Sequence, residues 1–344
     1  MEEPMQDSHT HQNHSLGEPK AMRFSGITSE YFSIWLSNLL LSVVTLGIYS
    51  AWAKVRRLQY FYNHTYLDDY AFGYHADGLQ ILKGRLIVVA TLIFLNVAAT
   101  FFPAIYIFLI IILFFAIPYL INLSLEFNAK VTSYRNLRFQ FRGDYWEAFL
   151  TFQIMPLLAL FTLGLLAPVA VKKAFDYVYN GLNYGGKRVS VELTYRAFYK
   201  VYVLVVISPL LLIGLLAGFV VPAEASFALG VIAVYVMLFL VYVVYRVCCL
   251  KLVFNNLKLA NKIAFSSSIS SPRLLWILFS NILAIVFTIG LAIPWAQVRK
   301  SRYLCNNIYT QTNPDFSDYI GAAQKEQSSI GEEFADFEGI ELGL

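Results

Sequence analysis

Six stretches of this sequence are long and apolar enough to enter a lipid bilayer. None contains Asp, Glu, Lys or Arg, and they cover residues 31–53, 86–125, 148–171, 201–223, 225–245 and 274–298. Crossing the hydrocarbon takes about 20 apolar helical residues, a length that every stretch reaches. Charged residues make up only 14% of the chain, whereas soluble domains carry about 25%. The chain is therefore predicted to be an integral membrane protein.

Two of these regions are predicted to form helical hairpins. Residues 86–125 are too long for a single crossing and contain Pro103 near the middle, which predicts two helices joined by a tight turn. Residues 201–245 have the same design, with the turn expected at residues 222–224.

One segment of the sequence occurs three times. Residues 45–63 align without gaps with the residues 117 and 243 positions further on, which chance explains poorly. The copies share a Thr, a Gly two positions later, and then Pro, Trp or both. These candidate structural or pathway positions, with an Asn that precedes the Thr in two copies, are Asn38, Thr45, Gly47 and Trp52 in the first copy, Thr162, Gly164 and Pro168 in the second, and Asn281, Thr288, Gly290, Pro294 and Trp295 in the third.

The polar residues of the repeated segment have two interpretations. Asn38 and Thr45 lie seven residues apart on one helical face, as do Asn281 and Thr288. They would line a polar path through the membrane or, in the simpler interpretation, form hydrogen bonds between helices. Because Gly and Pro interrupt helices, the repeated segments are predicted to be broken helices.

A basic residue and a tyrosine in the second half of each copy share a helical face. These candidate contacts for anionic lipid are Arg56 and Tyr60, Lys173 and Tyr177, and Arg299 and Tyr303. Lipid phosphate would attract the cations. Ordinary anchoring of amphipathic side chains at the membrane interface explains the pattern equally well.

The positions of Lys and Arg indicate the orientation of the chain. Every connection between apolar stretches is basic except the turns of the two hairpins. Cytoplasmic loops carry the excess of Lys and Arg, and seven spanning helices would export basic connections such as residues 172–200. We therefore expect the three repeated segments to enter the membrane and return, with only the hairpins spanning it. Seven spans are the alternative. In the first arrangement most basic loops and the C-terminus are cytoplasmic.

The sequence predicts one membrane domain between two tails. Residues 1–22 are expected to form a disordered N-terminal tail, and residues 311–344 an acidic disordered tail, because their composition buries little apolar surface. The membrane domain holds repeats around residues 23–75, 137–191 and 258–310, and the hairpins 86–125 and 201–245. Small surface β-hairpins are predicted around Asp68-Asp69 and Gly185-Gly186, and also at residues 137–141 and 257–265.

No constellation in the sequence predicts catalysis, a metal site or a cofactor. His75 and Asp77 form a His-x-Asp pair without a nucleophile motif or phosphate-binding loop, so a surface turn is the simpler interpretation. His9, His11 and His14 lie in the polar tail. The basic residues flank membrane segments and the net charge is only +4, which argues against nucleic-acid binding. The expected partners are membrane lipids, and the oligomeric state is left open.

The chain resembles a known family from about residue 22 to residue 310. The residues that carry the resemblance are Phe24-Ser25-Gly26, Glu30-Tyr31-Phe32, Trp35, Asn38, Thr45-Leu46-Gly47-Ile48-Tyr49, Trp52-Ala53 and Tyr60. They are similar to the signature of the YjgN family of bacterial inner-membrane proteins, a domain of unknown function. The second copy departs from this signature at Val169, where Trp would be expected. The resemblance implies a location in the bacterial inner membrane and supplies no substrate, cofactor or catalytic residue.

Together these observations predict an all-α, multi-pass membrane protein with three internal repeats, Gly- or Pro-broken segments and small surface β-hairpins. The predicted function is a transporter or channel-like protein for a small solute, because interrupted helices at equivalent positions of a repeat often surround a binding site. The alternative is a non-enzymatic membrane scaffold or anionic-lipid-interacting protein, which the basic and aromatic motif and the lack of charge within the apolar stretches favour.

Overall fold

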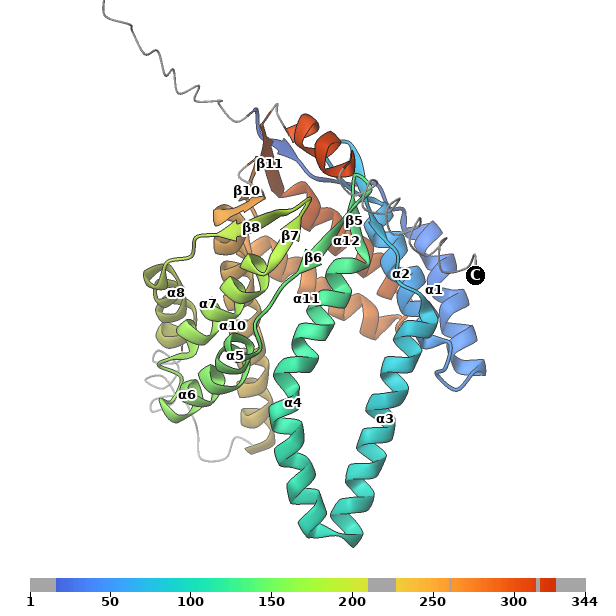
Figure 1. The fold of residues 1–344 in the computed structure, drawn as a ribbon, viewed down its shortest axis with the longest axis vertical. Coiled ribbons are helices and arrows are strands. Elements are labelled where there is room, and N and C mark those ends of the chain that lie inside the picture. Colours follow the sequence, from blue (N-terminus) through green and yellow to red (C-terminus); the bar gives the residue numbers. More distant parts are fainter. Residues whose placement is uncertain (1–16, 210–226, 260–261, 314–315, 326–344) are drawn as a thin grey trace, which may run out of the picture.

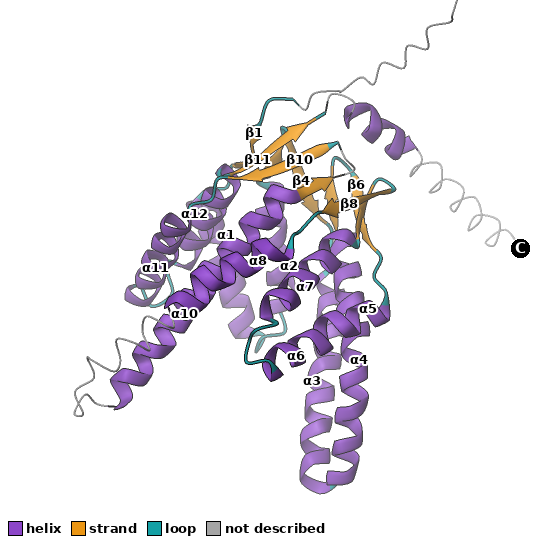
Figure 2. Cartoon of the chain, turned by 90° about the vertical axis from the view of Figure 1, so that its left-hand side faces the viewer, coloured by secondary structure: helices purple, strands orange, loops and turns teal. Residues whose placement is uncertain are grey.

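The computed structural model describes residues 17–209, 227–259, 262–313 and 316–325. Strands gather at one end of the molecule, and the helices extend away from them (Figures 1 and 2). The labelled helices are α1 (Thr28–Val44), α2 (Ser50–Asn63), α3 (Gly78–Phe101), α4 (Pro103–Lys130), α5 (Tyr145–Phe149), η1 (Leu150–Ile154), α6 (Met155–Phe161), α7 (Ala167–Asn180), α8 (Tyr195–Tyr202), η2 (Val203–Ile207), α10 (Phe227–Asn256), α11 (Ser271–Phe287) and α12 (Ile293–Asn306). A further helix covers residues 316–325.

Eleven short strands form one antiparallel sheet, in the order β1-β11-β10-β9-β8-β7-β6-β5-β4-β3-β2. The strands are β1 (Lys20–Ala21), β2 (Arg23–Phe24), β3 (Thr65–Leu67), β4 (Tyr70–Tyr74), β5 (Thr132–Tyr134), β6 (Leu137–Phe141), β7 (Leu182–Tyr184), β8 (Lys187–Val191), β9 (Leu257–Leu259), β10 (Ile263–Ser267) and β11 (Ile308–Thr312). Only Met22 separates the two edge strands, and β1 pairs with β11 while β2 pairs with β3. One extended segment therefore nearly closes the sheet into a barrel.

Tight turns with left-handed backbone join the strands of three hairpins. Both turn residues have positive φ at Asp68-Asp69 (46° and 65°), Arg135-Asn136 (47° and 63°) and Gly185-Gly186 (55° and 80°). Two-residue turns of this kind match the twist of antiparallel strands and favour Asp, Asn and Gly. The hairpins predicted at Asp68-Asp69 and Gly185-Gly186 are confirmed.

Aromatic and aliphatic side chains fill the interior of the sheet. Tyr134 and Tyr184 are almost fully buried there, together with Leu67 and Leu137. The hydroxyl of Tyr184 donates to the carbonyl of Tyr134 at 2.8 Å, and that of Tyr134 donates to the carbonyl of Leu67 at 2.8 Å. The helix at residues 316–325 buries one face against the same cluster. The interior of the sheet is therefore a packed core.

The helices come in pairs that leave the sheet and return to it. Three short pairs consist of α1 with α2, the helix 145–161 (α5, η1 and α6) with α7, and α11 with α12. The long pair is α3 with α4, which reaches well beyond the turns of the short pairs (Figures 1 and 2). Neighbouring pairs touch where α2 meets α3, α4 meets α5, α7 meets α8, α10 meets α11, and α12 meets α1. The pairs thus form a ring that follows the ring of strands.

Three described helices are long and apolar enough to cross a membrane. They are Gly78–Phe101, Pro103–Lys130 and Met237–Asn256. The first two meet at Phe102, directly before Pro103, so the turn predicted there is confirmed. The turn expected at residues 222–224 lies outside the described residues.

The prediction of an all-α fold with separate surface hairpins is wrong. The predicted hairpins are adjacent parts of the eleven-stranded sheet. They pair with one another because each helix pair returns the chain to the same end of the molecule, where unpaired strand edges meet and satisfy each other's backbone groups. Part of the stretch assigned to the acidic tail, residues 316–325, is helical and packs on the sheet.

Candidate functional site

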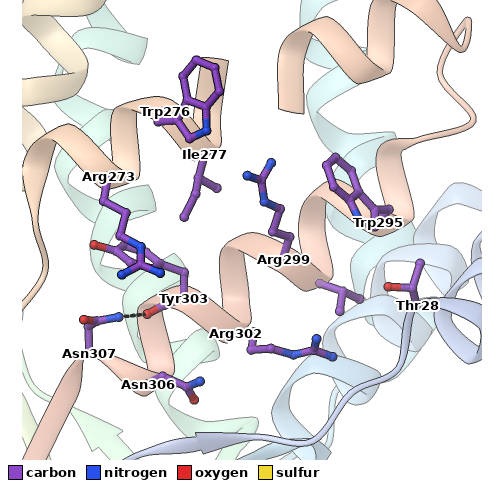
Figure 3. A pocket seen from close by; sticks show the side chains of 11 residues that line it. Thr28, Arg273, Trp276, Ile277, Trp295, Arg299, Arg302, Tyr303, Asn306 and Asn307 are labelled. Carbon is purple, nitrogen blue, oxygen red and sulfur yellow. Dashed lines mark hydrogen bonds between the residues drawn. The ribbon is translucent and has the colours of Figure 1, made fainter. Parts of the chain in front are cut away.

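A cavity of about 550 Å³ opens between α11, α12 and the first turn of α1 (Figure 3). It is bounded at the sheet end by the last residues of α12 and at the other end by two tryptophans. The lining residues are Thr28, Arg273, Trp276, Ile277, Trp295, Val298, Arg299, Arg302, Tyr303, Asn306 and Asn307. The lining contains three arginines and no carboxylate.

The three arginines have only neutral partners within the described part of the chain. Arg299 donates from Nη1 to the Ser280 hydroxyl at 2.7 Å and to Asn281 Oδ1 at 3.0 Å. Arg302 donates from Nη2 to the carbonyl of Gly26 at 2.9 Å. None of the three forms an ion pair with a described carboxylate. Among the described residues, no neighbouring carboxylate therefore neutralises the positive charge around the cavity.

Aromatic rings lie beside two of these cations. The Arg299 guanidinium carbon lies 4.9 Å from the centre of the Trp295 ring, and that of Arg273 lies 5.8 Å from the Tyr303 ring. Trp276 is 62% exposed and Trp295 is 39% exposed at the rim of the cavity. Tryptophan at a rim of this kind is typical of the boundary between hydrocarbon and water.

The predicted asparagines hold paired helices together. Asn281 is buried, donates from Nδ2 to the carbonyl of Ala296 at 3.0 Å, and presents Oδ1 to Arg299. In the first short pair, Arg56 donates to Asn38 Oδ1 at 3.5 Å and to the Tyr49 hydroxyl at 3.1 Å. The helix-to-helix interpretation therefore accounts for both asparagines.

The predicted threonines and glycines form the turns of the short pairs. Each threonine hydroxyl donates to a carbonyl four residues earlier and accepts an amide four residues later, as Thr45 does with Leu41 (2.8 Å) and Tyr49 (2.9 Å). The same bonds occur at Thr162 and Thr288. The glycines that follow have left-handed backbone, with φ of 89° at Gly47, 89° at Gly164 and 91° at Gly290. These hydroxyls are therefore engaged within the turn.

The predicted tyrosines tie each return helix to the start of its partner. The Tyr60 hydroxyl accepts from the amide of Ile27 at 2.8 Å and donates to its carbonyl at 2.9 Å. Tyr303 makes the same two bonds with Ser270 at 3.0 and 3.2 Å. Tyr177 donates to the carbonyl of Asp144 at 3.0 Å. Burial raises the pKa of Tyr177 to about 12 and also raises that of Tyr60, so both hydroxyls remain protonated donors.

The remaining predicted positions fall on the return helices. Pro168 and Pro294 are the second residues of α7 and α12, where proline fits a helix start. Trp52 packs over Gly78, where an added Cβ would lie 2.4 Å from the indole. Lys173 is half-buried on α7. Of the predicted residues, only Trp295, Arg299 and Tyr303 line the cavity together.

The sequence did not point to Arg273, Trp276 or Thr28 as site residues. Thr28 comes from the opposite end of the chain, and its proximity follows from the contact between α12 and α1. Arg273 is the lone cation at the start of an apolar helix, three residues before Trp276. A cation and a tryptophan spaced in this way at the start of an apolar helix could have indicated a site at the membrane surface.

Comparisons with known proteins place the chain among uncharacterised membrane proteins. Residues 19–337 match the family described as bacterial protein of unknown function, DUF898. An "Inner membrane protein YjgN" of Salmonella typhimurium is 27% identical over 85% of this chain and 88% of its own length. A protein of the same name from Escherichia coli O157:H7 is 28% identical over 43% of this chain and 38% of its own length. No solved structure matches the chain significantly.

Proposed function

This chain belongs to DUF898, a family of bacterial proteins of unknown function, and we propose that it binds the phosphate groups of anionic lipids in the bacterial inner membrane. The observation that supports the proposal is the cavity beside α12, where three arginines lack a described carboxylate partner. The names of the relatives support the inner-membrane location.

The chemistry of the cavity fits a phosphate diester attached to an apolar tail. Guanidinium groups present several N–H donors in a planar fork that matches phosphate oxygens. Arg273 and Arg302 are exposed and Arg299 is half-buried, so the donors not used by protein partners can face a ligand. Trp276 and Trp295 would contact the glycerol and upper acyl region, because indole rings favour that depth.

The short pairs have the dimensions of a single leaflet. From Asn281 to its last residue, Phe287, α11 rises about 9 Å, and from its first residue, Ile293, to Arg299, α12 rises about 9 Å, with the turn residues beyond. Half of the hydrocarbon thickness is about 15 Å. The turn residues Leu46, Leu163 and Ile289 are 94%, 95% and 94% exposed, which suits lipid and not water. We infer that the short pairs are copies of one re-entrant unit that returns before the bilayer centre is passed.

This placement puts the arginine cavity at the depth of lipid headgroups. Arg299 and Arg302 lie on the sheet side of the apolar part of α12, and Arg273 lies in the first turn of α11. The long pair continues into the opposite leaflet, because α3 rises about 23 Å from Leu86 to Phe101. No Lys or Arg lies in the far parts of α3 and α4, between Arg85 and Lys130. By the positive-inside rule, the sheet faces the cytoplasm.

Transport of a small solute, the other function that the sequence suggested, receives less support. Packed side chains fill the sheet interior, and the three threonine hydroxyls that would line a path are bonded within their turns. Solute flux through reconstituted vesicles, lost on changing Thr288 to Val, would favour transport over lipid binding.

The lipid-binding proposal is tested by counting retained lipids on the full chain. The protein would be purified from membranes, and bound phosphatidylglycerol and cardiolipin measured by native mass spectrometry. Each arginine near a lipid surface contributes about 1 kcal/mol, or roughly fivefold in affinity. We therefore expect Arg273→Gln to lower retention of anionic lipid about fivefold, and Arg273→Gln with Arg302→Gln to lower it further.

The matched control is Arg138→Gln, which removes an exposed cation from β6, away from the cavity. Retention unchanged in Arg273→Gln, or reduced equally by Arg138→Gln, would reject the cavity as the site. An excess of inorganic phosphate distinguishes the two sources of phosphate. A lipid site keeps its lipid in that excess, because the free ion lacks the acyl chains.

A further inference from the structure

We propose that the protein acts as a one-sided wedge, which adds cross-section to the sheet-side leaflet and so favours membrane that is convex on that side. This inference rests on the single-leaflet placement of the short pairs under the proposed function. It does not depend on the arginine cavity.

The wedge follows from where the helices end. Each short pair turns at an apolar tip, and the residue before each turn threonine is also strongly exposed: Val44 by 79%, Phe161 by 80% and Phe287 by 82%. Among the described helices, only α3, α4 and α10 are long and apolar enough to continue into the opposite leaflet. In Figure 2 the turn between α11 and α12 stands far short of the end of α3 and α4.

The added area is large enough to act on lipid packing. A helix with its side chains is about 10 Å across, or roughly 80 Å² in section. The three short pairs contribute six such sections, so the sheet-side leaflet holds roughly 500 Å² more protein than the opposite leaflet. Helices confined to one interface bind in a curvature-dependent manner for this reason.

Lipid is the occupant that fits all three tips. The tips lie on three different pairs around the molecule, and a continuous lipid phase reaches all of them without a partner of matching shape. The helices of the pair α11–α12 rise about 9 Å between the bridging Asn281 and Arg299 and the turn, which lies within the roughly 15 Å of one leaflet. The turns also share one backbone conformation, with φ of 49° at Leu46, 51° at Leu163 and 50° at Ile289, so each presents its side chain at the tip in the same way.

The wedge is tested by curvature sorting of the full chain. The protein would be reconstituted sparsely into vesicles of phosphatidylethanolamine and phosphatidylglycerol that range from small sonicated to large extruded ones. A cysteine at Gly186, in a variant whose Cys248, Cys249 and Cys305 are serine, takes an impermeant dye only where the sheet faces outward. We expect the density of outward-facing protein per membrane area to rise several-fold from large to small vesicles.

Two variants isolate the tips. The triple change Leu46→Ser, Leu163→Ser and Ile289→Ser should abolish the enrichment, because it makes the tips polar while altering side chains that are at least 94% exposed. The matched control Phe101→Ser with Phe102→Ser, at the far end of the long pair, should keep it. Circular dichroism checks that both variants fold.

The outcomes separate this inference from the proposed function. Equal density on all vesicle sizes, with tip cysteines protected from impermeant reagents, overturns the wedge while leaving the leaflet placement intact. Tip cysteines that react from solution overturn the leaflet placement itself. Enrichment that persists in Arg273→Gln, whether or not lipid retention falls, supports a wedge that is independent of the phosphate site.

Discussion

The short pair α11–α12 and the long pair α3–α4 leave the same sheet and return to it, but they are held together differently. In the short pair, Asn281 and Arg299 form hydrogen bonds between the helices. In the long pair, Asn96 and Thr100 bond back into their own helix, and only 6% of each apolar window is buried. Hydrogen bonds between polar side chains therefore hold the two helices of this short pair together. Apolar contact holds the two long helices together, which are largely exposed.

The turns of the two kinds of pair differ as well. The turn between α11 and α12 contains two left-handed residues, Ile289 and Gly290, with φ of 50° and 91°, whereas Phe102 connects α3 to α4 without a left-handed residue. A Gly turn reverses the chain within a few residues and leaves its apolar tip outermost. The difference indicates that turn chemistry and helix length together determine how deep a pair reaches.

The largest expected difference is in solvent accessibility of the tips. In a cysteine-free background, a cysteine at Leu163 should be protected from impermeant thiol reagents on both sides, since it ends within the hydrocarbon. A cysteine at Phe102 should react only from the side opposite the sheet, and one at Gly186 only from the sheet side. Labelling of the cysteine at position 163 from the far side would show that the short pair spans and would break the comparison.

Removing a bridging asparagine should affect only the short pair. Asn281→Ala removes one of the two side-chain acceptors of Arg299 and the side-chain donor to the carbonyl of Ala296, which costs about 1–3 kcal/mol of unfolding free energy. Asn96→Ala removes a bond within one exposed helix and should change stability by less than about 0.5 kcal/mol. Denaturant unfolding in mixed micelles measures both. Equal losses of unfolding free energy in the two variants would mean that the hydrogen bonds of Asn281 between the helices add no stability of their own.

Replacing a glycine by alanine should have opposite effects on stability in the turn of a short pair and in a helix of the long pair. Both effects should be smaller than that of Asn281→Ala. Gly47→Ala meets no atom within 4 Å but must adopt φ near 89°, which costs about 1–2 kcal/mol. Gly84→Ala lies inside α3 with open space around it and should stabilise by about 0.5–1 kcal/mol. Thermal unfolding midpoints should therefore move in opposite directions. A stabilising Gly47→Ala would show that the turn relaxes.

Local features of this fold could be predicted from the sequence, and long-range ones could not. The break at Pro103 and the turns at Asp68-Asp69 and Gly185-Gly186 depend on residues next to one another. Closure of the sheet depends on Lys20 and Thr310, which are 290 positions apart. Strands of two to five residues are too short for their hydrophobic periodicity to predict which strands pair.

The candidate site was predictable in part for the same reason. Arg299 and Tyr303 belong to the repeated segment and could be singled out, although the partner of each hydrogen bond could not. Thr28 reaches the cavity only because α12 packs on α1 across the closed ring. The sequence placed basic residues near the membrane surface, and the structure was needed to show that three of them share a cavity without a described carboxylate.

The smallest expected effect concerns the sheet, which serves both kinds of pair. Tyr134 follows the long pair and Tyr184 follows a short one, and the bond from the Tyr184 hydroxyl to the Tyr134 carbonyl joins them at 2.8 Å. Burial raises the pKa of both hydroxyls well above the ordinary value of 10.0. The folded protein therefore keeps protons that the unfolded chain releases above about pH 10.

Titration of these two tyrosines should thus leave the free energy of unfolding unchanged below about pH 10 and lower it as the pH rises above that value. Tyr184→Phe should flatten that fall at a cost of about 1 kcal/mol at neutral pH, because it removes the hydroxyl that titrates and its hydrogen bond to the carbonyl of Tyr134. Fluorescent probes on α4 and α7 should report one common midpoint at every pH, because the closed sheet couples the pairs. Separate midpoints would mean that the long and short pairs unfold independently. The shared sheet would then connect the pairs without making their unfolding cooperative.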